Sequence, residues 1–97
     1  MKVRRWVHCD DGTSLSVQAS KTHYCEPRED DAAEYTHVEV GFITKPDNTA
    51  APTPWGWKQY ADGDNVYAYV PAAKVHKFIE KHGGAISGEL PPFALGE

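Results

Sequence analysis

One segment of this 97-residue chain, near residues 71–82, has the repeat of an α-helix, and it limits the possible folds more than any other feature. Proline suits the first position of a helix, and glycines such as Gly83 and Gly84 take the left-handed conformation that ends one. Between Pro71 and Gly83, one side of the helical wheel carries Ala72, Val75, Phe78, Ile79 and His82. The pattern predicts a single helix, which can cover only one face of a sheet.

The other periodic segments alternate apolar and polar residues, as strands with one buried face do. They are residues 14–20, 35–42 and 66–70; residues 3–9, followed by the hairpin turn Asp10-Asp11-Gly12, also predict a strand. The intervening stretches are rich in proline, glycine or acidic residues and predict turns and loops, with one helical turn after Pro54. We therefore expect an α+β fold, a four-stranded, mainly antiparallel sheet with one C-terminal helix packed on one face.

After the helix, residues 85–97 predict an extended tail that docks through Phe93 or Leu95. The pleat assigns the strand residues before it to two faces. The face toward the helix should carry Leu15, Val17, Ala19, Val38, Val40, Phe42, Val66, Ala68 and Val70. The opposite, open face should carry Ser14, Ser16, Gln18, Ser20, His37, Glu39, Tyr67 and Tyr69. If the first strand also points its even-numbered residues to this face, Arg4, Trp6 and His8 join them. Gly41 marks a bulge or a close backbone approach.

Length and composition agree with one domain spanning residues 1–97, with 40% hydrophobic and 25% charged residues. No apolar run approaches the roughly 20 residues that span a bilayer, and the basic N-terminus is not followed by the apolar region of a signal peptide. We expect a cytoplasmic protein with no membrane partner. Cys9 and Cys25 form no CxxC pair and are expected to be reduced, structural thiols.

The acidic run at residues 26–34 accounts for the whole net charge of −4. The rest of the chain is balanced, so we expect no direct binding of nucleic acid, which needs a basic field. A separate hypothesis is that the acidic run mimics nucleic acid. Five carboxylates on one loop, however, form only a short row of negative charge for this purpose.

Chemically versatile side chains are densest between residues 20 and 28, at the end of a predicted strand. Arg28 offers a planar fork for phosphate or carboxylate, and Tyr24 or His23 can stack on a base. The alternative is that Arg28 pairs with its acidic neighbours in a solvated loop.

Two further groups suggest catalysis. Cys25 with His23 or His37 suggests a thiolate nucleophile, against the alternative of a small packed residue. His37 and Glu39 are expected to project from one strand face, where they suggest a pair of metal ligands or an acid–base pair. The alternative is that they form a cross-strand hydrogen-bonded pair.

Two groups suggest interfaces instead. The stripe of Lys74, Lys77 and Lys81 fits an acidic partner or a solvated helix face. Trp55 and Trp57 either seal the edge of the core or form an interface hot spot.

Several blocks resemble, in sequence and order, small uncharacterised accessory proteins encoded by tailed bacteriophages. The resemblance covers residues 14–84 and rests on Ser16-Val17-Gln18-Ala19-Ser20, His23-Tyr24-Cys25-Glu26-Pro27-Arg28, Tyr35-Thr36-His37-Val38-Glu39-Val40-Gly41-Phe42, and Val66-Tyr67-Ala68-Tyr69-Val70-Pro71 leading into His82-Gly83-Gly84. It implies no catalytic residue. It implies a role in binding, by disabling a host or defence protein or by sequestering a signalling nucleotide.

We therefore expect a non-enzymatic binding protein, without cofactor or metal, that counters a host or defence pathway. Its ligand would be nucleotide-like and anionic, and a host protein bound directly is the alternative; a small enzyme using Cys25, or His37 and Glu39, is the second alternative. The expected contacts are Gln18, Ser20, His23, Tyr24, Arg28, His37, Tyr67 and Tyr69. Surplus aromatic surface also predicts a homodimer.

Overall fold

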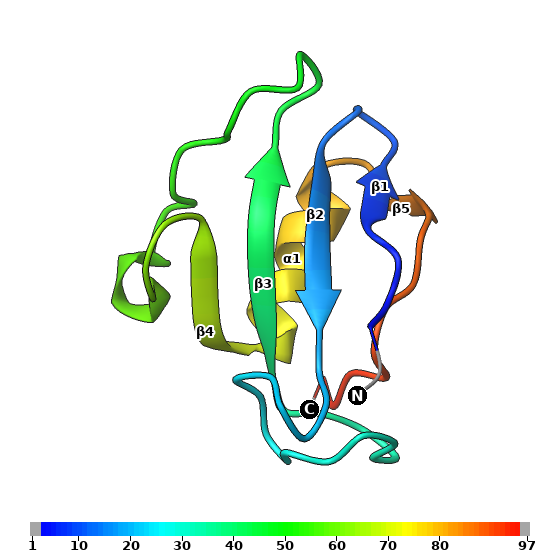
Figure 1. Ribbon diagram of the computed structural model, residues 1–97. Coiled ribbons are helices and arrows are strands. Elements are labelled where there is room, and N and C mark those ends of the chain that lie inside the picture. The colour runs from blue at the N-terminus through cyan, green and yellow to red at the C-terminus, as the bar shows by residue number, and fades with distance from the viewer. Residues whose placement is uncertain (1–2, 96–97) are drawn as a thin grey trace.

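The computed structural model describes residues 3–95 and contains one antiparallel sheet and one α-helix (Figure 1). The elements in chain order are β1 (Val7–Cys9), β2 (Ser14–Gln18), β3 (His37–Thr44), the 3-10 turn η1 (Lys58–Tyr60), β4 (Val66–Pro71), α1 (Ala72–Lys81) and β5 (Ala85–Ser87). The strand order is β4-β3-β2-β1-β5. Met1 and Lys2, and Gly96 and Glu97 at the end of the predicted tail, lie outside the described residues.

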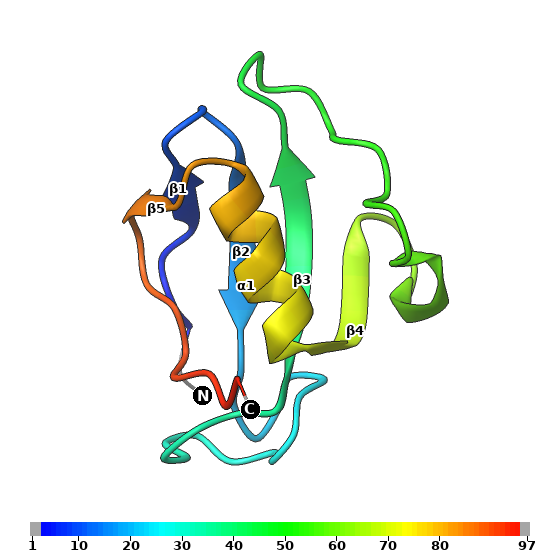
Figure 2. The ribbon, with the colours of Figure 1, turned by 180° about the vertical axis from the view of Figure 1, so that it is seen from behind.

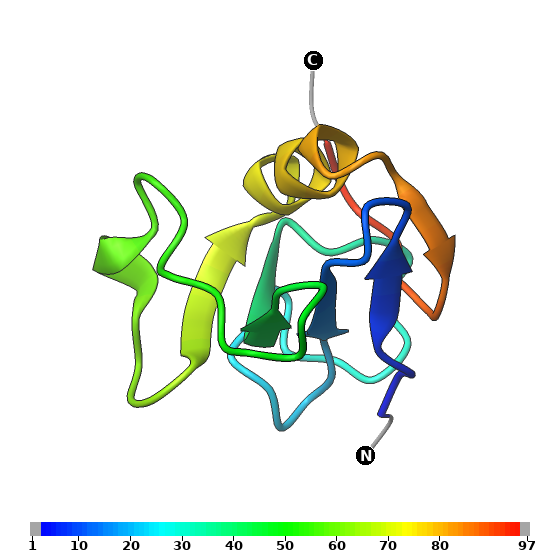
Figure 3. The same ribbon diagram turned by 90° about the horizontal axis from the view of Figure 1, so that it is seen from above.

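The helix α1 has the position and apolar side that the sequence predicts. It crosses one face of the sheet (Figure 2) and lies on that side only when the molecule is seen from above (Figure 3). Pro71 precedes its first turn, and Gly83 follows it with a φ of 93°. Ala72, Val75 and Ile79 are buried against the sheet, where removal of apolar surface from water stabilises the domain.

The α+β class is confirmed, but the sheet has five strands rather than four. The fifth strand, β5, comes from the predicted tail and pairs with β1. Its three residues are all exposed, so the sequence contains no apolar pattern from which this strand could be predicted. Gly88 follows β5 where the chain passes Trp6, and a Cβ atom there would overlap the Trp6 carbonyl group.

The tail beyond β5 returns to the loop before β3. Tyr35 donates its N–H to the Pro92 carbonyl at 2.8 Å and accepts from the Ala94 N–H at 2.8 Å. Phe93 is partly buried against the core as predicted, whereas Leu95 is exposed.

A bulge in β3 changes the predicted face of one residue. The pairing of β2 with β3 moves from Ser14–Thr44 to Ser16–Gly41, so β3 contains one extra residue. Phe42 at this point has a φ of 54° and is exposed, and Ile43 is buried in its place. The predicted inward position of Phe42 is wrong because one extra residue turns the following side chains to the other face.

A second bulge, in β4, has the same effect. Val38 pairs with Val70 and Val40 with Tyr67, so β4 again has one residue more than its partner. Tyr67 therefore faces the core with Val40, and its predicted place on the open face is wrong. Val66 and Ala68, predicted to face the helix, are only half-buried.

The two loop tryptophans have opposite environments. Trp57 is buried and packs against the rings of Tyr67 and Phe78, with centroid separations of 5.5 and 5.6 Å. Trp55 is 98% exposed. Trp57 therefore seals the edge of the core, as one of the two hypotheses states, and Trp55 does not.

Candidate ligand-binding site

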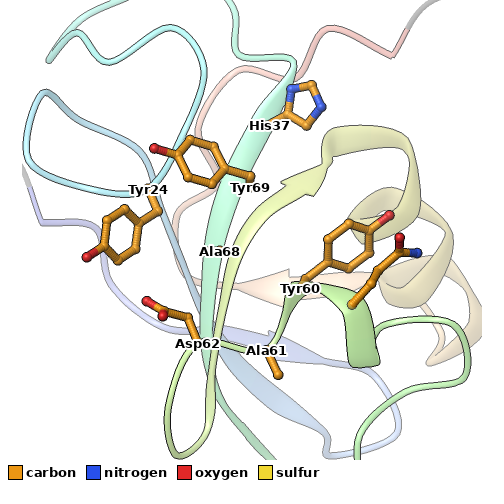
Figure 4. Close-up of a pocket in the computed structure, with 8 residues that line it drawn as sticks. Tyr24, His37, Tyr60, Ala61, Asp62, Ala68 and Tyr69 are labelled. Carbon is orange, nitrogen blue, oxygen red and sulfur yellow. The ribbon is translucent and has the colours of Figure 1, made fainter.

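An open, shallow depression of about 560 Å³ lies beside β4, on the side of the sheet away from α1 (Figure 4). Its lining comes from the loop after β2, the start of β3, the segment around η1, and β4. The lining residues are Tyr24, His37, Gln59, Tyr60, Ala61, Asp62, Ala68 and Tyr69. We call this depression the tyrosine pocket.

The aromatic wall of the tyrosine pocket is formed by Tyr24 and Tyr69, whose ring centroids are 5.8 Å apart. The β4 bulge turns Tyr69 outward with a φ of 52°, and its N–H donates to the Tyr24 carbonyl at 3.2 Å. The guanidinium carbon of Arg28 lies 5.8 Å from the Tyr24 ring centroid. Three of the predicted contact residues are thus brought together, in an arrangement that offers ring faces beside a cation.

Polar groups border the tyrosine pocket at its two ends. His37 lies at one end and Asp62 at the other, with Tyr60 across from Tyr69 (Figure 4). The Glu39 carboxylate, which is not among the lining residues, accepts the Tyr24 N–H at 3.1 Å. The pocket therefore combines stacking surfaces with hydrogen-bonding groups, and Arg28, which is not among its lining residues, places a cation against the Tyr24 ring.

Gln18, predicted as a ligand contact, instead supports the backbone. It is buried, and its amide accepts the Arg4 N–H at 2.8 Å and donates to the Arg4 carbonyl at 2.7 Å. Arg4 is also buried rather than on the open face, because its guanidinium donates to the Ala19 carbonyl at 2.6 Å. The first strand is shorter than predicted, so it does not keep the expected parity as far as Arg4.

Ser20 and His23 also lie outside the lining of the tyrosine pocket. The Ser20 hydroxyl is fully buried, accepts the Thr22 N–H at 3.1 Å and lies 2.6 Å from the His23 imidazole. These bonds shape the turn that leads to Tyr24. Tyr67 is buried in the core, and its hydroxyl donates to Thr53 at 3.2 Å.

Sequence reasoning missed Gln59, Tyr60 and Asp62. They belong to a segment interpreted only as a helical turn followed by a tight turn. The available signal was that tight turn, because a chain that reverses at residues 62–65 places the segment before the turn alongside the strand that follows it. The structure has this return, with Ala61 bridging to Tyr67 and the Asp62 N–H donating to the Val66 carbonyl at 2.8 Å.

The geometry around Cys25 does not favour a nucleophile. The side chain is fully buried, and its thiol donates to the Ser20 carbonyl at 3.1 Å. Burial raises the pKa of the Cys25 thiol, whereas a reactive cysteine has a lowered pKa and access to substrate. Burial, and secondarily the Asp11 carboxylate, also raises the pKa of Cys9. Both cysteines are free and buried, which agrees with their predicted structural role.

His37 and Glu39 project to the same side of β3, as predicted. The His37 Nδ1 lies 2.9 Å from the Thr36 hydroxyl, and the Glu39 carboxylate is engaged by the Tyr24 N–H. Within residues 3–95, no group of three or more histidine, cysteine, aspartate or glutamate side chains is arranged to hold a metal ion.

The described part of the chain has no helix with the length and apolar character required to cross a membrane. Comparison of the sequence and the fold with protein-family models, curated proteins and solved structures finds no match in any of the three.

Proposed function

We propose that this protein is a non-enzymatic binding protein that takes a nucleotide-like anionic ligand in the tyrosine pocket. The observation that carries the proposal is the cluster of Arg28, Tyr24 and Tyr69 beside an open depression. Aromatic faces stack on bases of any sequence, and a guanidinium binds phosphate oxygens through two parallel hydrogen bonds. Their proximity lets one small ligand engage both.

The polar border of the pocket supports a ligand of limited charge. Asp62 lines the depression, and the Glu39 carboxylate accepts the N–H of Tyr24 in its aromatic wall, so two carboxylates belong to the site or its immediate support. Like charges in a shared site are costly, and a triphosphate would place several anionic groups near these carboxylates. A ligand with one or two phosphates fits better, with Asp62 accepting hydrogen bonds from a sugar hydroxyl or a base amino group.

The biological setting is part of the same proposal. The resemblance to phage accessory proteins supports a role in countering a host or defence pathway, in the cytoplasm of the host cell. The two buried free thiols support a reducing compartment, because oxidising compartments favour disulfides.

Thermal-shift and calorimetric titration with cyclic mononucleotides and ADP-ribose derivatives test the proposal. Ligand at 100 times its Kd should stabilise the fold by about 2.7 kcal/mol. Arg28→Gln and Tyr69→Ala should abolish the shift. Arg5→Gln is the matched control, because Arg5 is exposed and pairs with Glu89 away from the pocket. Absence of binding by the unmodified protein would overturn the proposal.

The second candidate is direct binding of a host protein through the open face of the sheet. The Trp6 and Phe42 rings stack there with centroids 6.0 Å apart and planes 11° from parallel. They remain 41% and 49% exposed, which is typical of aromatic residues that become buried in an interface. Host-protein capture that is lost in Trp6→Ser and kept in Arg28→Gln would favour this candidate over the nucleotide.

A further inference from the structure

We propose a second binding surface, on the helix side of the molecule, that takes an acidic peptide segment of another protein through one apolar anchor side chain. The surface consists of two hollows on either side of Pro54 and Trp55, with volumes of about 350 and 320 Å³. Phe78 and Lys81 of α1 line both hollows, so together they form one groove. We call it the lysine–tryptophan groove.

The first hollow is suited to an apolar side chain. Its lining comes mainly from the loop after β3 and from the C-terminal half of α1, with Thr13 and His82 also contributing. Most of its lining is aliphatic or aromatic, including Ile43, Ala51, Pro52 and Phe78. A hollow of this size and lining can accommodate a leucine or an aromatic ring, and anchors of this kind provide most of the binding energy of an interface.

Trp55 gives an independent reason to expect an occupant. Its neighbour Trp57 already closes the core, so Trp55 is not needed for that purpose. It stands 98% exposed between the two hollows, where both of its sides can be covered. Tryptophan is the residue type most enriched among binding hot spots, and an exposed indole loses unfavourable contact with water when a partner covers it.

The charge of the groove identifies the chemistry of the partner. Lys74, Lys77 and Lys81 line the second hollow, and Lys45 and Lys81 line the first. None of the lining residues is acidic, although the protein as a whole carries a net charge of −4. The helix dipole favours Lys81 in the last turn of α1 but disfavours Lys74 in the first turn, so helix stability does not explain the lysine at position 74. The local charge is complementary to aspartate and glutamate side chains.

A peptide fits the groove better than nucleic acid. Single-stranded nucleic acid binds to series of aromatic platforms along a basic track, whereas the groove presents one exposed indole beside an apolar hollow. The acidic run of residues 26–34 also repels a long polyanion. This run is itself a poor occupant from a second copy, because its apolar residues are only Pro27, Ala32 and Ala33.

Selection from a displayed library of random 12-residue peptides on the full chain tests the inference. The expected consensus is one aromatic residue or leucine flanked by two or more acidic residues. The consensus peptide should lose at least tenfold in affinity with Trp55→Ala and with the triple variant Lys74→Gln, Lys77→Gln, Lys81→Gln. Arg28→Gln should leave its affinity unchanged, which separates this groove from the tyrosine pocket.

Matched controls keep the test specific. Lys21→Gln with Arg5→Gln removes two exposed charges from residues that line neither hollow and should not weaken peptide binding beyond twofold. Thermal denaturation should show each variant folded, since all the altered side chains are exposed. Selection of peptides without acidic residues, equal binding by Trp55→Ala, or tighter binding of oligothymidylate than of the peptide at the groove would each overturn the inference.

Discussion

The side chain of Gln18 takes the place of a neighbouring strand for Arg4, because its amide forms hydrogen bonds with both the N–H and the carbonyl of that residue, at 2.8 and 2.7 Å. Gln18→Ala would leave two backbone groups without these partners in a buried environment. A lost partner costs about 1–3 kcal/mol for a buried group. We expect urea denaturation to show a loss of about 2–4 kcal/mol, given that the two effects overlap.

Gln59→Ala is the control for Gln18, because Gln59 is exposed and its amide donates to the carbonyl of Gly56, three residues away. Its effect should stay within about 0.5 kcal/mol. Equal stability of Gln18→Ala and the unmodified protein would show that water replaces the Gln18 amide.

The carboxylate of Asp11 links the β1–β2 turn to the end of α1 and should make stability depend on acid pH. It accepts the Thr13 N–H at 2.9 Å and lies 2.6 Å from the His82 imidazole. These hydrogen bonds, that of Thr13 first, lower the pKa of Asp11. Its stabilising contribution is therefore complete above the ordinary carboxyl range and is lost as the pH falls through the lowered pKa.

Asp11→Asn should consequently show a smaller drop in the urea midpoint between pH about 5 and 2 than the unmodified protein. Asp64→Asn, in the exposed turn before β4, removes the same charge and serves as the control. Identical acid profiles for the unmodified protein and Asp11→Asn would contradict the linkage.

The two tryptophans of the 55–57 loop should differ sharply in their effect on stability. Trp57 is 4% exposed and contacts the rings of Tyr67 and Phe78. Trp57→Ala should cost about 3–5 kcal/mol, since it leaves a cavity at the edge of the core. Trp55→Ala should stay within about 0.5 kcal/mol in the same thermal or urea measurement, and a comparable loss in both would mean that Trp55 also supports the fold.

We expect a homodimer that buries the stacked pair of Trp6 and Phe42. The pair is exposed on the open face, where a second copy of the same face would cover it. Light scattering at about 100 μM, well above micromolar affinities, should give a dimeric mass, and Phe42→Ser should give a monomeric one. A monomeric mass for the unmodified protein would disprove this arrangement.

The helix and the existence of β1 to β4 could be predicted because their patterns are local. The spacing of apolar residues in α1 indicates which side of the helix is buried, and alternation of apolar and polar residues indicates which face of a strand is buried. The bulges could not be placed, because an extra residue is defined only by the strand opposite. Gly41 suggested a bulge, and β3 does bulge beside it, but the pattern did not show that Phe42 turns outward.

The candidate site was predictable in part for the same reason. Tyr24 and Arg28 share a short loop, and His37 and Tyr69 project from strands whose general position was expected. Tyr67 was assigned to the wrong face because the β4 bulge lies between it and Val70. Tyr60 and Asp62 were missed because the path of their segment depends on Trp57 packing into the core.

Pairing of β1 with β5 joins residues near positions 8 and 86. Because they lie far apart in the sequence, this pair can form only late in protein synthesis. The strands β1 to β4 follow one another as a meander, so contacts among neighbours can form while the chain is still being made. The outer edge of β1 stays without its partner until residues 85–87 have left the ribosome and paired with it. Until then a nascent chain presents an unpaired strand edge to other nascent chains, and pairing with β5 removes the opportunity for such misassembly.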